Sequence, residues 1–570
     1  MSTAREAAIV AAACTVLYLT GTADIPFYTR GEPREGLVVR EMIATDRWLV
    51  PARPEGEPAR KPPLYYWTAA LALRALPAEP ERALRLPSAV LATAAVLATW
   101  ATARALFGDP AALPAALVLA TAFEWTRAAT SARVDMTLAA ALTAVLAGWL
   151  LALARGGWGG LALAAAGAAL GALAKGPVAI VLPFLVAIAL AAVRRDRAVL
   201  RRLHPLVVLG AATAAAALWY AAAFREQGAG FLDVVARENW LRFVDAEGAR
   251  TGHAHGAAYL LPLGLVGLLP WSPLLPLALA PLRGARTAPA IALAGVWIVT
   301  GVVFFSLAAA KRSVYLLPLF PAVALLLGAG VAAPPGGRPL RLARIGAVAY
   351  APAAFAVAAV ALGVALGVDV GAVLRPFLEP DDAAGAVALV DAVRSAAGSV
   401  SLLALATAAI GLLAARATRT GNWRQLVVAV AAAMVAWTAL FNGLLHPAIA
   451  RDRSLRAFLA RVGAQVPADA ALYAMFPPDP GLRFYAPQAL RAWPREGTSD
   501  GGYLLLWEDE WRQLRDTGGR PLPVVAVSDA RQPSRGALSL VEVPPGPLRR
   551  TAEDPGPPRP PGVRTGSRSR

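Results

Sequence analysis

One charged stretch of the sequence contains side chains that could carry out acid–base and phosphate chemistry. It reads TRGEPREGLVVREMIATDRWLVPARPEGEPARKPPLYYW and occupies 29–67. Glu32 is a carboxylate that could accept a proton, and Arg34 and Lys61 are cations that could bind a phosphate. Two prolines fix the backbone after Lys61, and the aromatic residues behind them are typical of a membrane interface. This composition indicates an active site rather than a linker.

Further charged residues interrupt apolar segments much later in the chain. Asp135 follows Arg133 by two positions, Lys175 separates two apolar runs, and Lys311-Arg312 lie shortly before Tyr315. A charged side chain costs about 2.5 to 3.5 kcal/mol at the centre of a bilayer. Charges kept in such places therefore indicate function, and we expect them to join the first stretch in one site.

Two histidines, His253 and His255, form a His-x-His pair in a polar loop. Such a pair could bind a divalent metal ion, although two ligands alone do not complete a site. No other cofactor is indicated. The chain's one cysteine, Cys14, excludes an internal disulfide and a cysteine-based metal site.

The composition places these residues in a polytopic membrane protein. Of 570 residues, 57% are hydrophobic and 16% charged, and the mean hydropathy is +0.53, values that a soluble domain does not reach. The net charge of +18 comes largely from arginines in short loops between apolar runs. There they orient helices and meet anionic lipid head groups, so nucleic-acid binding is not expected.

About thirteen apolar runs are long enough to cross a bilayer, which takes about 20 residues. They lie at about 7–23, 86–106, 111–127, 134–154, 158–174, 176–193, 205–224, 257–281, 288–309, 313–333, 343–367, 398–415 and 425–446. The first run lacks a cleavage site and is expected to remain as an anchor. The run at 64–77 is too short and predicts an interfacial helix, which leaves 24–63 as an outer catalytic loop.

The arginine-rich loops fix the predicted orientation. If 64–77 does not span, the loops near Arg202, Arg286, Arg344 and Arg419 all fall on the side of the N-terminus, which the positive-inside rule makes cytoplasmic. The C-terminus then lies outside. The same alternation of spans places every charged motif described above on the outer face, where one cavity could collect them.

The sequence changes character after about residue 450. Residues 1–450 form the predicted all-α transmembrane domain, and 451–543 contain short apolar segments separated by turn residues, as in a small outer α/β domain. The tail at 544–570 is rich in Pro, Gly and Arg and is predicted to be disordered.

Several motifs, in order and with similar spacing, resemble the ArnT-like membrane glycosyltransferases of the GT-C fold, relatives of protein O-mannosyltransferases. The motifs are GEPREGLVVREM at 31–42, DRWLVP at 46–51, RKPPLYYW at 60–67, RLPSAV at 85–90, ARVDMTL at 132–138, LAKGPVA at 173–179, LLPW at 268–271 and FFSLAAAKRSVYLLPLFPA at 304–322. The resemblance implies transfer of a sugar from a polyprenyl (undecaprenyl) phosphate to a lipid, protein or glycan. It places this reaction at the periplasmic face of the bacterial inner membrane.

The resemblance also implies roles for single residues. Arg34, Lys61 and Lys175 match positions associated with the lipid phosphate. Positions of the donor pocket are matched by Tyr65, Tyr66, Lys311, Arg312 and Tyr315.

The acid usually assigned as catalytic is missing from this chain. Many relatives carry Asp-Glu where this chain has Gly31-Glu32. Glu32 is the nearest replacement as the base, Asp135 is the alternative, and a mechanism that uses neither stays open. Relatives with a metal use an acid where this chain has Arg60, which weakens the case for a metal at the histidine pair.

Two other functions compete with a glycosyltransferase. A secondary transporter would also carry intramembrane charges, but the sequence shows no inverted repeat and its charges gather at one face. A protein that binds or flips lipid phosphates without catalysis would explain the missing acid. No motif specifies the sugar, the acceptor or the oligomeric state.

Overall fold

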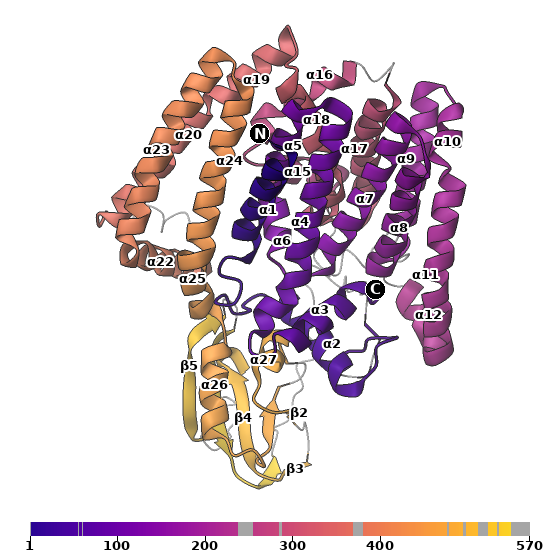
Figure 1. Cartoon of the computed structure of the whole chain (residues 1–570). Coiled ribbons are helices and arrows are strands. Elements are labelled where there is room, and N and C mark those ends of the chain that lie inside the picture. Colours follow the sequence, from indigo (N-terminus) through magenta and orange to yellow (C-terminus); the bar gives the residue numbers. More distant parts are fainter. Residues whose placement is uncertain are drawn as a thin grey trace, which may run out of the picture. The chain divides into compact units, whose positions relative to one another are not determined.

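The protein is described by a computed structural model that is mostly helical (Figure 1). It describes residues 2–54, 56, 58–59, 61–236, 255–283, 288–368, 380–475, 478–493, 497–510, 522–532 and 535–548. The chain divides into two compact units, Met1–Arg451 and Asp452–Arg570. This division falls one residue from the boundary that the sequence predicts.

The first unit is a bundle of long apolar helices. Within the described residues, 9 helical segments are long and apolar enough to cross a membrane. They are α4 (Pro80–Phe107), α7 (Val134–Arg155), α8 (Trp158–Lys175), α10 (Ala198–Leu203) with α11 (Pro205–Gln227), α17 (Pro289–Leu307), η5 (Ser313–Leu319) with α18 (Phe320–Ala332), α19 (Arg338–Val348) with α20 (Tyr350–Ala365), α23 (Ala397–Thr420), and α24 (Trp423–Leu440) with η7 (Phe441–Leu445) and α25 (His446–Arg453).

The remaining predicted spans correspond to shorter or broken helices. Three of them are α1 (Thr3–Leu19), α5 (Asp109–Thr121) and α9 (Val178–Arg194). A fourth is a chain segment bent by 95° between α15 (Leu260–Gly267) and η3 (Ser272–Ala278) with α16 (Leu279–Leu282). Each predicted run therefore coincides with a helix or helix pair. The multi-pass architecture is confirmed, whereas the count of about thirteen spans stays a prediction.

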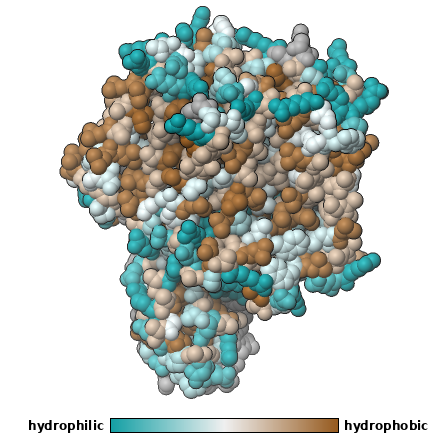
Figure 2. All heavy atoms as spheres, viewed as in Figure 1, coloured by the Kyte–Doolittle hydropathy of each residue, from teal (hydrophilic) through white to brown (hydrophobic). Residues whose placement is uncertain are grey.

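The surface of the bundle has the character of a lipid-facing protein. On α17, the side chains of Val299, Val303 and Leu307 are 53% to 70% exposed and recur every four residues along one face. Figure 2 shows apolar side chains over the flanks of this unit and hydrophilic ones gathered at its upper edge. Helices α10, α16 and α19 lie at that end of the bundle, opposite α2 (Gly31–Thr45) and α3 (Leu64–Ala75) (Figure 1).

The predicted outer loop 24–63 contains a helix that the sequence analysis did not anticipate. Helix α2 has 15 residues, and a proline in its first turn is compatible with helix initiation. The helix ends at Asp46, which adopts a left-handed conformation with φ of 55°. Helix α3 has 12 residues, about 18 Å at 1.5 Å per residue, too short to cross a hydrocarbon core of about 30 Å. Its predicted position in the interface stays a prediction.

Several short helices complete the first unit. They are α6 (Phe123–Ala129), α12 (Ala229–Ala236), η2 (Ala257–Tyr259) and α22 (Pro380–Ser395).

The second unit contains a small mixed sheet with the strand order β2-β1-β4-β6-β5. Its strands are β1 (Leu472–Ala474), β2 (Leu490–Ala492), β4 (Gly502–Trp507), β5 (Val524–Gln532) and β6 (Gly536–Val543). Strand β1 is parallel to β2 and β4, whereas β6 is antiparallel to β4 and β5. Helix α26 (Arg456–Gln465) packs on this sheet. Its Phe458 and Leu459 form one buried core with Leu505 of β4 and Leu538 of β6.

Two details of this unit differ from the predictions. One of the short apolar segments, 482–485, belongs to a helix, α27 (Pro480–Tyr485), whereas the pattern of short segments and turns is typical of strands. A two-stranded sheet pairs β3 (Gly497–Ser499) with β7 (Gly546–Leu548), so the beginning of the predicted tail is ordered. Residues 549–570 lie outside the described residues.

Candidate active site

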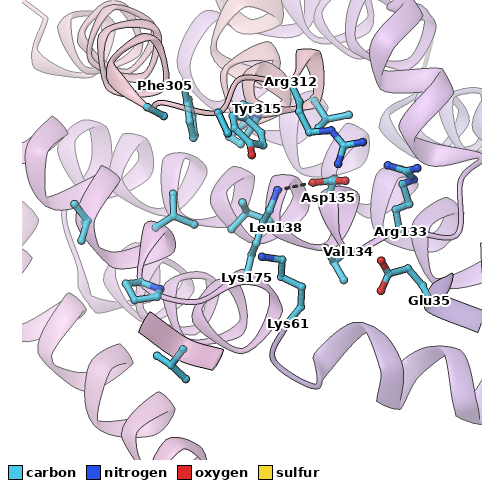
Figure 3. Close-up of a pocket in the computed structure, with 18 of the residues that line it drawn as sticks. Glu35, Lys61, Arg133, Val134, Asp135, Leu138, Lys175, Phe305, Arg312 and Tyr315 are labelled. Carbon is cyan, nitrogen blue, oxygen red and sulfur yellow. Dashed lines mark hydrogen bonds and ion pairs between the residues drawn. The ribbon is translucent and has the colours of Figure 1, made fainter. Parts of the chain in front are cut away.

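A cavity of about 520 Å³ lies beside α2 and α3 in the first unit (Figure 3). Its polar lining consists of Arg34, Glu35, Arg53, Lys61, Tyr66, Arg133, Asp135, Lys175, Arg312 and Tyr315. Its apolar lining includes Val134, Leu138, Pro177, Val178, Val181, Phe304, Phe305 and Pro318. One cavity thus collects residues separated by nearly 300 positions in the sequence.

Helices α2 and α3 supply one wall through a connected set of polar side chains. The guanidinium of Arg34 donates a hydrogen bond of 2.8 Å to Oε1 of Glu35, and the hydroxyl of Tyr66 donates one of 2.7 Å to Oε2. Glu35 is 7% exposed. Both of its oxygens are therefore engaged within the wall. Lys61 precedes the two prolines that introduce α3, and its ammonium group points into the cavity (Figure 3).

The segment between α2 and Lys61 is held by indole hydrogen bonds. Trp48 donates to Oδ1 of Asp46 at 2.7 Å, Trp67 donates to the carbonyl of Trp48 at 2.6 Å, and Trp219 donates to the carbonyl of Leu49 at 2.8 Å. The segment is thereby fastened to α3 and α11. These bonds support Arg53 and Lys61 at the cavity edge.

Helices α7 and α8 supply a buried ion pair. Nζ of Lys175, the last residue of α8, donates to Oδ1 of Asp135, in the first turn of α7, at 2.5 Å. The ammonium also lies 5.0 Å from the centre of the Tyr315 ring. The two helices pack closely between the turn that joins them and this ion pair: a Cβ at Gly167 of α8 would lie only 2.7 Å from the carbonyl oxygen of Ala141 in α7.

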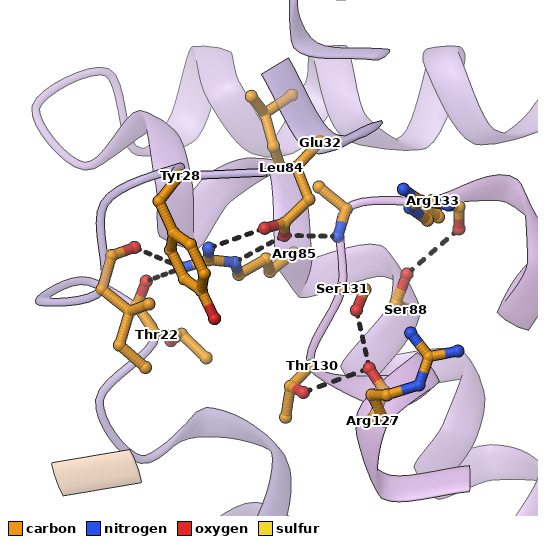
Figure 4. Close-up of polar contacts among 12 residues, drawn as sticks. Thr22, Tyr28, Glu32, Leu84, Arg85, Ser88, Arg127, Thr130, Ser131 and Arg133 are labelled. Carbon is orange, nitrogen blue, oxygen red and sulfur yellow. Dashed lines mark hydrogen bonds and ion pairs between the residues drawn. The ribbon is translucent and has the colours of Figure 1, made fainter. Parts of the chain in front are cut away.

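Glu32, the first candidate for the base, does not line the cavity. Its carboxylate forms a bidentate pair with Arg85, at 2.8 and 3.0 Å, and accepts a 3.0 Å hydrogen bond from the N–H of Ala132 (Figure 4). Arg85 also donates to the carbonyls of Thr22 and Ile25. Burial by itself raises the pKa of Glu32, but the charge and hydrogen bonds of Arg85 outweigh it and lower the pKa overall. Glu32 therefore joins α2 to α4 and to the turn before α7.

Two other predicted donor-pocket residues also lie behind the lining. The hydroxyl of Tyr65 donates to the carbonyl of Leu84 at 2.9 Å, which fastens α3 to α4. The ammonium of Lys311 donates to the carbonyls of Ala308 and His255 at 2.7 and 2.8 Å. Both side chains shape the backbone around the cavity without facing it.

Only one histidine of the His-x-His pair is among the described residues. His253 lies outside the described residues, whereas the ring of His255 stacks on Tyr259 with 3.7 Å between the ring centres. The described part of the chain contains no group of three or more His, Cys, Asp or Glu side chains that could hold a metal ion. Metal binding at this pair stays a prediction.

Three lining residues were missed by the sequence analysis as site residues: Glu35, Arg53 and Arg133. A helix in the first charged stretch would have placed Glu35 one turn after Glu32, but that helix was not anticipated. Arg133 had a signal in its position two residues before Asp135. The scarcity of lysine was a further signal that the sequence analysis did not use. The chain's only lysines are Lys61, Lys175 and Lys311, and all three lie in or next to the cavity wall.

The lining suits an amphiphilic anion. Cations outnumber carboxylates on the polar side, and the carboxylates of Glu35 and Asp135 already have cationic partners. Preorganised cations in a cavity of low dielectric stabilise a bound or developing anion. The apolar side, with Val181 41% exposed at its border, offers a surface for a hydrocarbon chain.

Parts of the sequence are similar to known sugar transferases. Residues 60–220 match the family model described as dolichyl-phosphate-mannose-protein mannosyltransferase. An undecaprenyl phosphate-alpha-4-amino-4-deoxy-L-arabinose arabinosyl transferase from Aeromonas hydrophila is 27% identical over 55% of this chain and 57% of its own length. One from Edwardsiella ictaluri is 30% identical over 52% and 54%. The matches thus span little more than half the length of these relatives.

The structural comparison covers nearly the whole chain. ArnT from Cupriavidus metallidurans, bound to undecaprenyl phosphate, superimposes with a TM-score of 0.75 at 21% identity, over 95% of this chain and 98% of that one. The same protein in the apo state gives a TM-score of 0.73. The two chains share one fold.

Proposed function

We propose that this chain, which shares its fold with ArnT, is a glycosyltransferase that transfers a sugar from a polyprenyl phosphate, such as undecaprenyl phosphate, to a lipid, protein or glycan acceptor. The observation that carries the proposal is one cavity in which Lys61, Lys175 and Arg34 face a wall of valine, phenylalanine and proline side chains. A polyprenyl phosphate has the same two-part chemistry.

The donor fits the cavity through its two ends. The phosphate is held by Lys61, with Lys175 and Arg34 close by, because charge-assisted hydrogen bonds to phosphate are the strong ones. The isoprenoid chain runs along Val178, Val181 and Phe305. Tyr66 and Tyr315 flank the space left for the sugar.

The reaction requires a base for the acceptor and a cation for the leaving group. The acceptor hydroxyl attacks the anomeric carbon of the sugar while Asp135 takes its proton. The bond between the anomeric carbon and the phosphate oxygen breaks, and the phosphate leaves with the electron pair. Lys61 and Lys175 stabilise that charge. An incoming phosphate competes with Asp135 for Lys175, which frees the carboxylate for its task.

A protein that binds lipid phosphate without transferring sugar is the second candidate. The observation in its favour is that Arg34 and Lys175 already engage the cavity carboxylates, Glu35 and Asp135. Binding and transfer must therefore be measured separately.

The test uses purified full-length protein with undecaprenyl phosphate and with undecaprenyl-phosphate sugars. We expect binding of the lipid phosphate and release of undecaprenyl phosphate from the sugar donor. Lys61→Ala should weaken binding about 10- to 100-fold, because a charge-assisted contact of about 1.5 to 3 kcal/mol is lost. Arg82→Ala, which removes a half-buried arginine paired with Glu79 outside the cavity, is the control. Binding without release supports the second candidate, and no binding refutes both.

For localisation, we propose the bacterial inner membrane, with the N-terminus cytoplasmic, the cavity and the second unit periplasmic, and about thirteen spans. The basic segments around α10 and α19 lie at the end of the bundle opposite α2 and α3, and basic loops stay in the cytoplasm. A reporter fused after Arg202 or Arg344 should be cytoplasmic, and one fused after Lys61 or Arg451 should be periplasmic. A cytoplasmic reporter at Lys61 would refute the orientation.

A further inference from the structure

Gly31, where the resemblance leads one to expect an acid, is covered by an arginine from another helix. A Cβ built on Gly31 would lie 1.6 Å from Nη2 and 2.4 Å from Cζ of Arg133. The guanidinium therefore occupies the volume in which any side chain at position 31 would begin. Gly31 is the first residue of α2 and Arg133 immediately precedes α7, so this contact joins two walls of the cavity.

Arg133 carries charge that the described residues do not neutralise directly. In the cavity, Arg34 pairs with Glu35 and Lys175 pairs with Asp135. Glu32 pairs with Arg85 behind it. The guanidinium groups of Arg133 and Arg312 both line the cavity, and neither forms a hydrogen bond or ion pair within the described part of the chain.

The two unpaired guanidinium groups are also neighbours. Figure 3 shows them next to one another beside the carboxylate of Asp135. Burial, followed by the positive charge of Arg133, lowers the pKa of Arg312, and the nearby charge of Asp135 opposes this shift without cancelling it. An anion between them would relieve the repulsion, and planar guanidinium groups match the geometry of phosphate oxygens.

We propose that Arg133, seated over Gly31, is a further phosphate-binding residue of this site and forms with Arg312 a clamp on the phosphate of the lipid donor. This inference rests on the proposed function and adds to it a residue and a reason for the glycine. The absence of a side chain at position 31 is what allows Arg133 to reach its place.

The geometry makes Gly31→Ala a specific probe of the position of Arg133. The methyl group would collide with the end of a flexible side chain, which can swing away, rather than with backbone. Alanine is also the better helix former at the first position of α2. The variant should therefore fold normally and lose only the placement of the guanidinium.

The experiment measures the Kd for undecaprenyl phosphate with full-length Gly31→Ala, Arg133→Ala and the double variant. We expect each single variant to weaken binding about tenfold, the effect of losing one charge-assisted contact. The double variant should be no weaker than Arg133→Ala, because Gly31→Ala acts only through Arg133. Gly210→Ala, where a Cβ meets nothing within 4 Å, is the matched control and should bind as the wild type does.

Two further ligands separate the clamp from other effects. Binding of undecaprenol, which lacks the phosphate, should be the same in wild type and variants, and an excess of inorganic phosphate should compete less well in the variants than in the wild type. Weaker binding of undecaprenol in both variants would refute the clamp. If Lys61→Ala weakens binding of undecaprenyl phosphate but Gly31→Ala and Arg133→Ala do not, this inference fails alone. If the wild type does not bind the lipid phosphate, the proposed function fails as well.

Discussion

Asp135→Asn is expected to lower turnover by roughly 100- to 10,000-fold, the loss typical of removing a general acid–base group, while donor affinity stays equal or improves. Asparagine keeps the shape of the side chain but cannot take the proton of the acceptor. It also ends the ion pair with Lys175, which is 2.5 Å long in the wild type, and leaves that ammonium to the donor phosphate. Single-turnover release of undecaprenyl phosphate tests the expected loss of turnover, and the Kd for the donor tests the expected affinity.

The matched control is Glu35→Gln, since Glu35 also faces the cavity. Its oxygens accept hydrogen bonds from Arg34 and Tyr66 within the cavity wall, so we expect a smaller loss of turnover together with weaker donor binding. The reverse ranking, with Asp135→Asn within twofold of wild type and Glu35→Gln severely impaired, would assign the base to Glu35.

Glu32→Ala is expected to lower the free energy of unfolding by about 3 to 5 kcal/mol, because it leaves a buried arginine without its partner. The side chain of Arg85 is only 4% exposed. Because the pKa of Glu32 is lowered below its ordinary value of 4.5, the pair stabilises the fold above that value. This contribution is lost as the pH falls through the folded-state pKa. Denaturant titration of wild type and variant, at neutral and acidic pH, measures the difference.

Glu41→Ala, on the same helix but without an ion pair among the described residues, should change stability by less than about 0.5 kcal/mol. The conservative variant Glu32→Gln separates the two roles considered for Glu32. If Glu32→Gln is as stable as the wild type but loses turnover by 100-fold or more, Glu32 is the base, as the sequence first suggested. Loss of stability, with turnover per folded molecule retained, supports the structural role.

The sequence by itself predicted a helical membrane bundle and seven of the ten polar residues that line the cavity, whose roles stay predictions. Membrane helices are local objects, because an apolar run of sufficient length must cross the bilayer with its backbone hydrogen bonds satisfied internally. The predicted runs therefore fall on helices, and the resemblance carried by the short motifs agrees with the structural comparison. Charge also has a local cost in such a chain, which is why Lys61, Asp135, Lys175 and Arg312 could be selected before the structure was known.

The roles within the charged stretch depended on the tertiary structure. Glu32 and Glu35 differ by three positions on one helix, a rotation that leaves both near the same face. Packing alone turns Glu32 toward Arg85 and Glu35 toward the cavity. Helix α2 has no long stripe of apolar residues at helical spacing. Neither the helix nor the face that it turns toward the cavity could therefore be derived from periodicity.

The same limit applies to partners that are distant in sequence. Asp135 and Lys175 meet because glycines let α7 and α8 pack closely, and Gly31 is informative only when the guanidinium of Arg133 is seen over it. The positions of the charged motifs and of the arginine-rich loops predicted a cationic site at one face of a membrane bundle. Contacts between helices decided which acids face the cavity and which of its cations form ion pairs with them, because those contacts depend on packing that no single segment of the sequence contains.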